Sequence, residues 1–181
     1  MTDQLQKPGT EQALLREMGF TAQNIERRKR IVGLATEDSK RIALLKDVVQ
    51  KNVDELTSTF FSYLGGLEES KVLLGNRDLS EKARVLKSEH LADMVRGEYG
   101  SDYVEQRLRL ALIYSKAGLD ARVFLGAFHH LLRAIGVLVM KQFEQRPLEG
   151  FESFMSLKKV AFLDIAIIVD VLISERERVI R

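Results

Sequence analysis

The sequence predicts an all-α protein, and three observations support this fold class. Apolar residues recur three and four positions apart through almost all of the 181 residues, as they do on one face of a helix. Runs that alternate between apolar and polar residues, as half-buried strands do, are absent. Both prolines, Pro8 and Pro147, stand at expected helix boundaries. A chain of this length buries roughly 70% of its unfolded surface, so we expect one domain with a full core.

Each expected helix has its own start and stop signals. In chain order, the helices are expected at residues 10–18, 21–33, 36–66, 68–74, 78–97, 101–118, 120–146 and 151–181. Thr21, Thr36 and Asp120 have side chains that cap a helix N-terminus, and Glu37 and Asp38 add acids to a first turn. Glycines stand near the ends of the first six helices, and a proline ends the seventh.

The two ends of the chain are expected to differ in character. Residues 1–20 predict a flexible N-terminal extension with one short helix, ahead of a domain over 21–181. The last helix is apolar on more than one side between Val160 and Val169, so it should be buried on more than one side. Its final turns carry no cap, which suggests a linker helix that leads to a signalling module.

Composition excludes several classes of protein. The chain has no Cys, which removes disulfides, thiolate metal sites, iron–sulfur clusters and Cys nucleophiles, and which fits a cytoplasmic protein. The longest apolar stretch, 160–173, is too short for a membrane span and contains two Asp, so no membrane partner is expected. The basic run 27–30 lacks interleaved aromatic residues, and the net charge is only +2, so no nucleic-acid partner is expected.

Polar residues in apolar surroundings are the candidate functional groups. No phosphate-binding loop, zinc motif or acid/base pair occurs, which predicts that the protein is not an enzyme. His90 falls on the apolar face of its helix, where a core residue is a more frequent finding than a ligand. Asp164, inside an apolar run, must find a partner on another helix or subunit or shift its pKa.

Four stretches together resemble the sensor globins, the protoglobin family that forms the N-terminal domains of globin-coupled sensors. They are Gly33-Leu34-Ala35-Thr36-Glu37-Asp38, the segment from Arg96 to Arg109 with its Tyr-Val pair at 103 and 104, the segment from Gly118 to Phe128, and Leu163-Asp164-Ile165-Ala166. The resemblance covers about residues 25–175. It implies a globin-like fold with an extra N-terminal helix and a homodimer formed by the last two long helices.

The resemblance also implies haem, although the usual ligand is missing. The family holds haem through a His four residues before the Gly of a Gly-Leu pair, and here that position is Tyr114. The family's frequent distal Tyr corresponds to Phe61, and His90 falls in the helix where a distal His sometimes stands. Phe124 and Phe128 complete the expected cofactor pocket.

Three alternatives follow for this pocket. Tyr114 can ligate iron as a phenolate, which favours ferric haem and therefore redox or NO sensing over reversible oxygen binding. His90 can ligate from the other side. In the third alternative no haem binds, the bulky side chains fill the pocket, and the fold serves signalling, partner interaction or an apolar ligand. We therefore expect a non-enzymatic sensory domain. The main expectation is haem-based gas or redox sensing with the signal passed through the C-terminal helix, and haem-free signalling or partner interaction is the alternative. The expected partners are a second copy, a downstream signalling domain or protein and, with haem, a diatomic gas.

Overall fold

The computed structural model describes residues 8–180, and these residues form helices joined by short turns. The helices are α1 (Pro8–Glu17), α2 (Ala22–Ile31), α3 (Thr36–Ala43), α4 (Lys46–Lys51), α5 (Val53–Gly65), α6 (Lys71–Gly75), α7 (Arg77–Met94), α8 (Ser101–Lys116), α9 (Ala121–Gln142) and α10 (Pro147–Ile180), with a 3-10 turn at Glu68–Ser70. The described part contains no strand, which confirms the all-α prediction. Of the expected N-terminal extension over residues 1–20, residues 1–7 lie outside the described part, and α1 forms a short helix in the rest.

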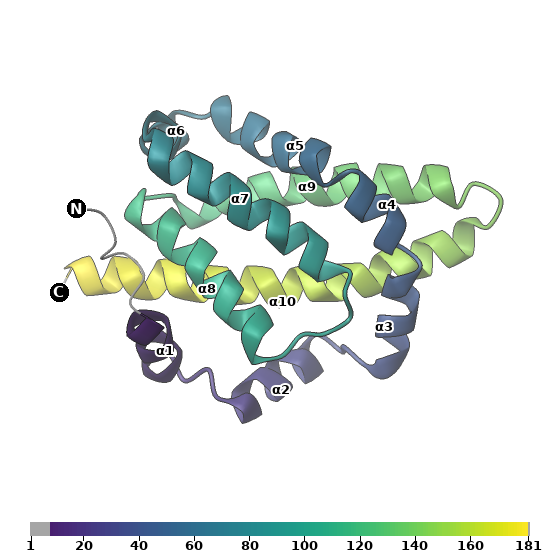
Figure 1. Cartoon of the computed structure of the whole chain (residues 1–181), viewed down its shortest axis with the longest axis horizontal. Coiled ribbons are helices and arrows are strands. Elements are labelled where there is room, and N and C mark those ends of the chain that lie inside the picture. Colours follow the sequence, from purple (N-terminus) through teal and green to yellow (C-terminus); the bar gives the residue numbers. More distant parts are fainter. Residues whose placement is uncertain (1–7, 181) are drawn as a thin grey trace.

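The longest helix, α10, sets the long axis of the molecule. α9 runs antiparallel beside it, and α7 and α8 cross in front of it (Figure 1). α5 packs on α9 and α7, while α1 and α2 pack against α8 along the lower edge (Figure 1). α9 has the length and apolar composition that a membrane-spanning helix needs, and in this fold it packs between α5 and α10.

The expected long helix over 36–66 is wrong: it is divided into α3, α4 and α5. The chain turns at Leu44 and Leu45, where backbone N–H groups bond three residues back instead of four. This turn brings Leu45 into the core with no exposed surface. A second turn follows at Asn52, whose side-chain amide donates to the carbonyl of Val48 at 2.7 Å. No Gly or Pro marks either turn, so helical periodicity alone did not reveal them.

Other boundaries were close to those expected. Asp120 caps α9 through a bond from the backbone N–H of Arg122 at 2.7 Å, and Gly118, with φ +67°, ends the turn after α8. α9 ends at Gln142, four residues earlier than expected, and α10 begins at Pro147 instead of 151. Proline suits the first position of a helix because that N–H has no partner within the helix.

α10 is buried over most of its middle, as its composition predicted. Val160, Ala161, Leu163, Ile167 and Ile168 are at most 1% exposed. Nearer its N-terminal end, α10 is attached to α3 by polar contacts to the buried carboxylate of Asp38, which accepts from Ser156 Oγ at 2.7 Å and from Lys159 Nζ at 3.1 Å. These hydrogen bonds and the charge of Lys159 outweigh burial and lower the pKa of Asp38. Farther along α10, the core contains several more buried charged groups.

Candidate functional site

Aromatic rings from three helices meet in the space enclosed by α5, α7, α8 and α9. Phe60 of α5, Tyr114 of α8 and Phe124 and Phe128 of α9 have no exposed surface, and Phe61 has 1%. Ring centres lie 6.2 Å apart for Phe60 and Tyr114, 5.8 Å for Tyr114 and Phe124, and 5.7 Å for Phe124 and Phe128. These separations are those of rings in direct contact, so the side chains form one continuous aromatic cluster.

A buried lysine lies against this cluster. Lys87 of α7 has no exposed surface, and its Nζ lies 4.2 Å from the ring centre of Phe60 and 4.4 Å from that of Phe128. Aromatic faces attract cations, so both rings favour the charged ammonium. Burial acts in the opposite direction and, with the nearby charge of Arg107, lowers the pKa of Lys87 to about 7, although Asp164 opposes the shift.

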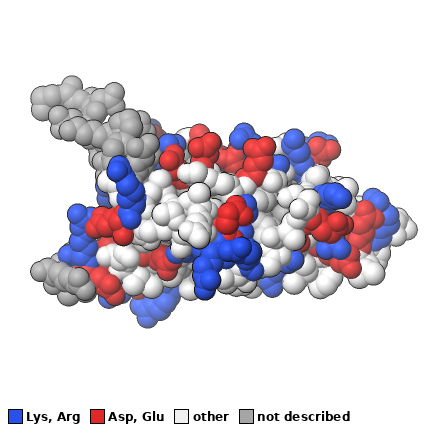
Figure 2. Space-filling model, turned by 90° about the horizontal axis from the view of Figure 1, so that it is seen from below, with Lys and Arg blue, Asp and Glu red and all other residues white. Residues whose placement is uncertain are grey.

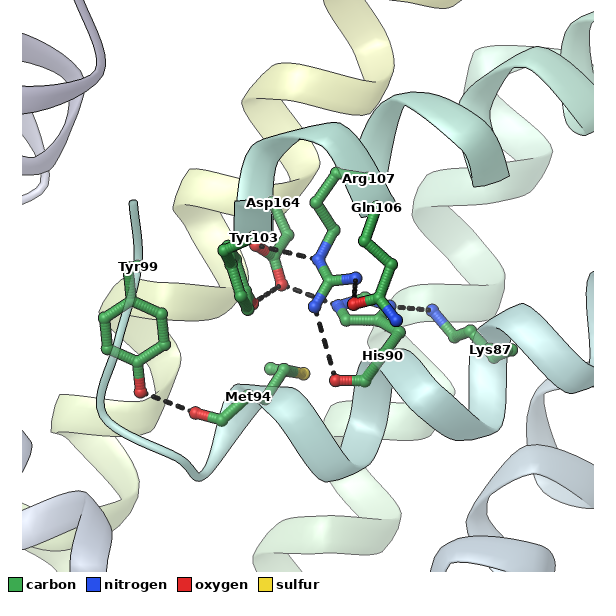
Figure 3. A network of polar contacts seen from close by, with 8 residues as sticks. All are labelled: Lys87, His90, Met94, Tyr99, Tyr103, Gln106, Arg107 and Asp164. Carbon is green, nitrogen blue, oxygen red and sulfur yellow. Dashed lines mark hydrogen bonds and ion pairs between the residues drawn. The ribbon is translucent and has the colours of Figure 1, made fainter. Parts of the chain in front are cut away.

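Next to Lys87, four more polar side chains form a buried network that joins three helices (Figure 3). Asp164 of α10 has oxygen Oδ2 2.6 Å from His90 Nε2 of α7, and the same oxygen accepts from Tyr103 of α8 at 2.7 Å. The guanidinium of Arg107, also on α8, lies 3.5 Å from the other oxygen, Oδ1. His90, Arg107 and Asp164 have no exposed surface. This set, with Lys87, is the buried charge cluster.

Geometry fixes how His90 takes part in the buried charge cluster. A carboxylate only accepts hydrogen bonds, so His90 carries its proton on Nε2 when it bonds to the ionised Asp164. Nδ1 is then an acceptor, 3.4 Å from Lys87 Nζ. Burial, assisted by the charges of Arg107 and Lys87, lowers the pKa of His90 well below its usual value, so the imidazole is neutral near pH 7. Both of its ring nitrogens have partners.

The acidic member of the cluster is also shifted. Burial raises the pKa of Asp164 to about 6, and the positive charges of Arg107 and Lys87 and the bond from Tyr103 oppose that rise. Arg107 donates to Gln106 at 2.9 Å and to the backbone carbonyl of His90 at 3.4 Å. Asp164 is therefore a buried carboxylate between cationic and neutral donors on two neighbouring helices, as the sequence required of an acid in an apolar run.

The structure brings the five expected pocket residues into one region. Tyr114, Phe61, Phe124 and Phe128 belong to or touch the aromatic cluster, and His90 lies 6.0 Å from Phe128 between ring centres. The other two histidines, at 129 and 130, are exposed on α9. Sequence reasoning found Asp164 but missed three of its neighbours. Lys87 with His90, and Tyr103 with Arg107, stand three and four residues apart on single helices, so each pair shared a helix face that could have been noticed.

The side chains at the expected haem position do not fit the group in this arrangement. A porphyrin is larger than any side chain here, yet the rings of α5, α8 and α9 touch one another and Lys87 where it would lie. His90 has no free nitrogen for iron. Within the described part of the chain the hydroxyl of Tyr114 has no hydrogen-bond partner, but burial raises the pKa of Tyr114, away from the phenolate that binds iron.

The helix order and the way α7 and α8 cross α10 over an aromatic-lined site define a globin-fold domain. The globin domain of the Geobacter sulfurreducens globin-coupled sensor has the same fold: the superposition gives a TM-score of 0.71 and covers 80% of this chain and 95% of that one, at 17% sequence identity. The profile of the Protoglobin family matches residues 21–178. The chain therefore belongs to the protoglobin family.

One relative has a name that describes a sensory protein. The haem-based aerotactic transducer HemAT of Halobacterium salinarum is 27% identical over 117 residues, which are 64% of this chain and 24% of the relative. The chain thus spans about a quarter of the length of that protein. This relative supports the family assignment, and the structural match supports the fold.

Proposed function

We propose that this protein is a non-enzymatic, haem-free sensory domain of the globin-coupled sensor type. The single observation that carries the proposal is the closed aromatic cluster around Lys87 at the expected haem position. Because protein side chains fill this pocket, the domain responds to its stimulus through its own side chains and not through a bound cofactor. The relatives' names, a sensor and a transducer, support a signalling role over catalysis.

The signal is proposed to leave through α10. This helix carries Asp164, the residue that bonds to both α7 and α8, and it continues 16 residues beyond that point, to Ile180. Any rearrangement between α7 and α8 therefore acts on α10 directly. A downstream signalling domain or protein is the proposed recipient, because the matched relative is much longer than this chain.

A homodimer through α9 and α10 is part of the proposal. Large apolar side chains are exposed along both helices: Leu125, Val137 and Met140 on α9, and Leu148, Phe151, Met155, Phe162 and Ile173 on α10. On α10 they are three, four, seven and eleven residues apart, so they follow one face. Seen from below, uncharged patches near the middle of the molecule lie between groups of Lys, Arg, Asp and Glu side chains (Figure 2). Two copies joined along such faces form a four-helix bundle, which buries the apolar side chains.

Light scattering on the full chain at tens of micromolar tests the dimer. We expect the mass of two chains for the wild type and of one chain for Phe162→Glu, because a charge would be buried at the interface. Val85→Glu is the matched control, since Val85 is 59% exposed on α7, outside the proposed face. A wild-type monomer, or equal masses for both variants, would count against this interface.

Haem-based gas or redox sensing is the second candidate, and one observation favours it. The buried hydroxyl of Tyr114 has no hydrogen-bond partner among the residues that the structure describes, and binding to ferric iron would supply one. In that case the rings of Phe60, Phe124 and Phe128 must separate to admit the group.

An absorption spectrum separates the two candidates. The chain is purified from haem-supplemented cells, together with Tyr114→Phe and His90→Ala. The haem-free proposal predicts no Soret band in any sample. A Soret band in the wild type that is lost in Tyr114→Phe would establish the second candidate and refute the first, and loss in His90→Ala would assign the other ligand.

A further inference from the structure

The buried charge cluster has a feature that pocket filling does not require. Apolar side chains alone could fill the space, yet Lys87, Arg107 and Asp164 are all completely buried. Buried charges cost free energy unless they are paired and hydrogen-bonded, and this cluster has two cations for one carboxylate. In addition, Nε of Arg107 and Oδ1 of Asp164 form no hydrogen bond with any of the described residues. The cluster is therefore sensitive to the gain or loss of a single proton.

We propose that the buried charge cluster is a proton-operated switch, in which proton uptake changes how α10 packs against α7 and α8. The proposal rests on the function above, because it names the stimulus of the proposed sensor and takes α10 as the output. The tests of haem content and of dimer formation do not depend on this switch.

The groups that face Lys87 come from every helix packed around its ammonium. His90 lies on the same helix, Arg107 and Tyr103 come from α8, and Asp164 comes from α10. α5 and α9 contribute only the uncharged rings of Phe60 and Phe128. Among the described residues, the charges that act on Lys87 are those of Arg107 and Asp164, so one carboxylate must balance both cations.

The charge of the cluster changes across the neutral pH range. Above about pH 7, Lys87 is largely neutral, and Arg107 and Asp164 balance each other. Below about pH 6, Lys87 is charged and Asp164 is increasingly protonated, so two cations remain without a balancing acid. Burial also lowers the pKa of His90, which favours its neutral form.

This change acts on α10 because Asp164 is the residue through which α10 enters the cluster. An ionised Asp164 accepts from Tyr103 and His90 and attracts Arg107. Protonation removes that attraction and turns one acceptor oxygen into a donor. The remaining cations then repel each other in a medium of low dielectric, and they are relieved when α10 moves away or water enters.

The cluster also has a connection to solvent. Arg107 donates to Gln106, which is half-buried, and Gln106 donates at 3.3 Å to Glu89, which is exposed on α7. The exposed carboxylate of Glu89 is thus linked to Asp164 through the side chains of Gln106 and Arg107. Because Lys87 and Asp164 have no exposed surface, proton exchange with the solvent requires local opening around α7 and α8.

The experiment is an NMR titration of the full chain between pH 5.5 and 8.5. Lysine side chains are labelled with carbon-13 and the backbone with nitrogen-15, and the Lys87 signal is identified by its loss in Lys87→Met. All samples also carry His129→Gln and His130→Gln, two exposed positions on α9, so that His90 is the one histidine left in the chain.

We expect the Lys87 signal to titrate more than about 2 pH units below an ordinary lysine. Backbone amides over 157–172 of α10 should shift with the midpoint of Lys87 or of Asp164. Lys87→Met should lose the component with the Lys87 midpoint, and Lys82→Met, which removes a half-exposed lysine of the same helix, should keep it.

Two results would overturn the proposal: Lys87 titrating with the surface lysines, or Lys87 titrating while the α10 amides stay unchanged. The wild-type titration decides both, so the outcome does not depend on the stability of any variant. A haem-free dimer without an α10 response would leave the proposed function standing and refute the switch alone. A Soret band would refute the proposed function, whatever Lys87 does.

Discussion

Replacing Lys87 with Met gives the sharpest stability test of the buried charge cluster. Met has nearly the same length as Lys and no charge, so Lys87→Met keeps the contacts with Phe60 and Phe128 while it removes the titrating group. The unfolded chain holds the Lys proton with an ordinary pKa near 10.4, whereas in the folded protein that pKa is about 7. The two states therefore differ in bound protons between these values.

The sign of the pH dependence follows from that difference. Between pH 7 and about 10, the unfolded state binds the proton that the folded state has lost, so the free energy of unfolding rises with pH. Below pH 7 the Lys87 ammonium is charged in both the folded and the unfolded state, so the folded state bears the full free-energy cost of burying it. One titrating group changes the free energy of unfolding by at most about 1.4 kcal/mol per pH unit. Lys87 should therefore raise the free energy of unfolding by about 2–3 kcal/mol between pH 7 and 9.

Urea denaturation of both proteins at pH 7, 8 and 9 measures this contribution. We expect Lys87→Met to be more stable than the wild type at pH 7, with the difference narrowing by about 2–3 kcal/mol at pH 9. Other titrating groups are common to both proteins and cancel in the comparison. Lys82→Met, which removes a half-exposed lysine, should follow the wild type. Parallel pH profiles for Lys87→Met and the wild type would refute the shifted pKa.

Two further substitutions test the polar groups of the core. Asp164→Asn should destabilise the fold by about 3–5 kcal/mol in urea denaturation, because it leaves the buried cation of Arg107 unpaired. Asp170→Asn is its control on the same helix: its side chain is 47% exposed, and losing its ion pair should cost about 1 kcal/mol or less. Equal losses would contradict a buried pair. Tyr114→Phe removes a buried hydroxyl that has no partner in the described part of the protein, so the free energy of unfolding should stay the same or rise by about 1 kcal/mol. A loss of several kcal/mol would show that the hydroxyl has a partner in solution.

Much of the fold could be predicted from the sequence because helix signals are local. Asp120 caps α9, and Pro147 marks a helix boundary, by rules that involve only neighbouring residues. The division of 36–66 into three helices could not be predicted in this way. One turn allows Leu45 to pack in the core, which is a tertiary contact. The other is stabilised by the bond from the Asn52 side chain to the carbonyl of Val48, and no Gly or Pro marks it in the sequence.

The candidate site was predicted in part. An acid in an apolar helix must have a partner, and this reasoning identified Asp164 as significant before its neighbours were known. Lys87 and Arg107 were not identified, because on single helices each reads as an ordinary exposed cation. Their burial follows from how α7, α8 and α10 cross, which is a property of the whole fold. The same crossing places rings and a lysine where the family resemblance implied haem.

Titration of the purified chain with ferric haem tests the central claim most directly, namely that protein side chains occupy the haem position. Absorption in the Soret region and the thermal midpoint of unfolding are followed together, since a ligand that binds only the folded state raises that midpoint. We predict a spectrum that is the sum of free haem and protein, with an unchanged midpoint. A saturable Soret shift at one haem per chain, with a raised midpoint that Tyr114→Phe abolishes, would contradict the account.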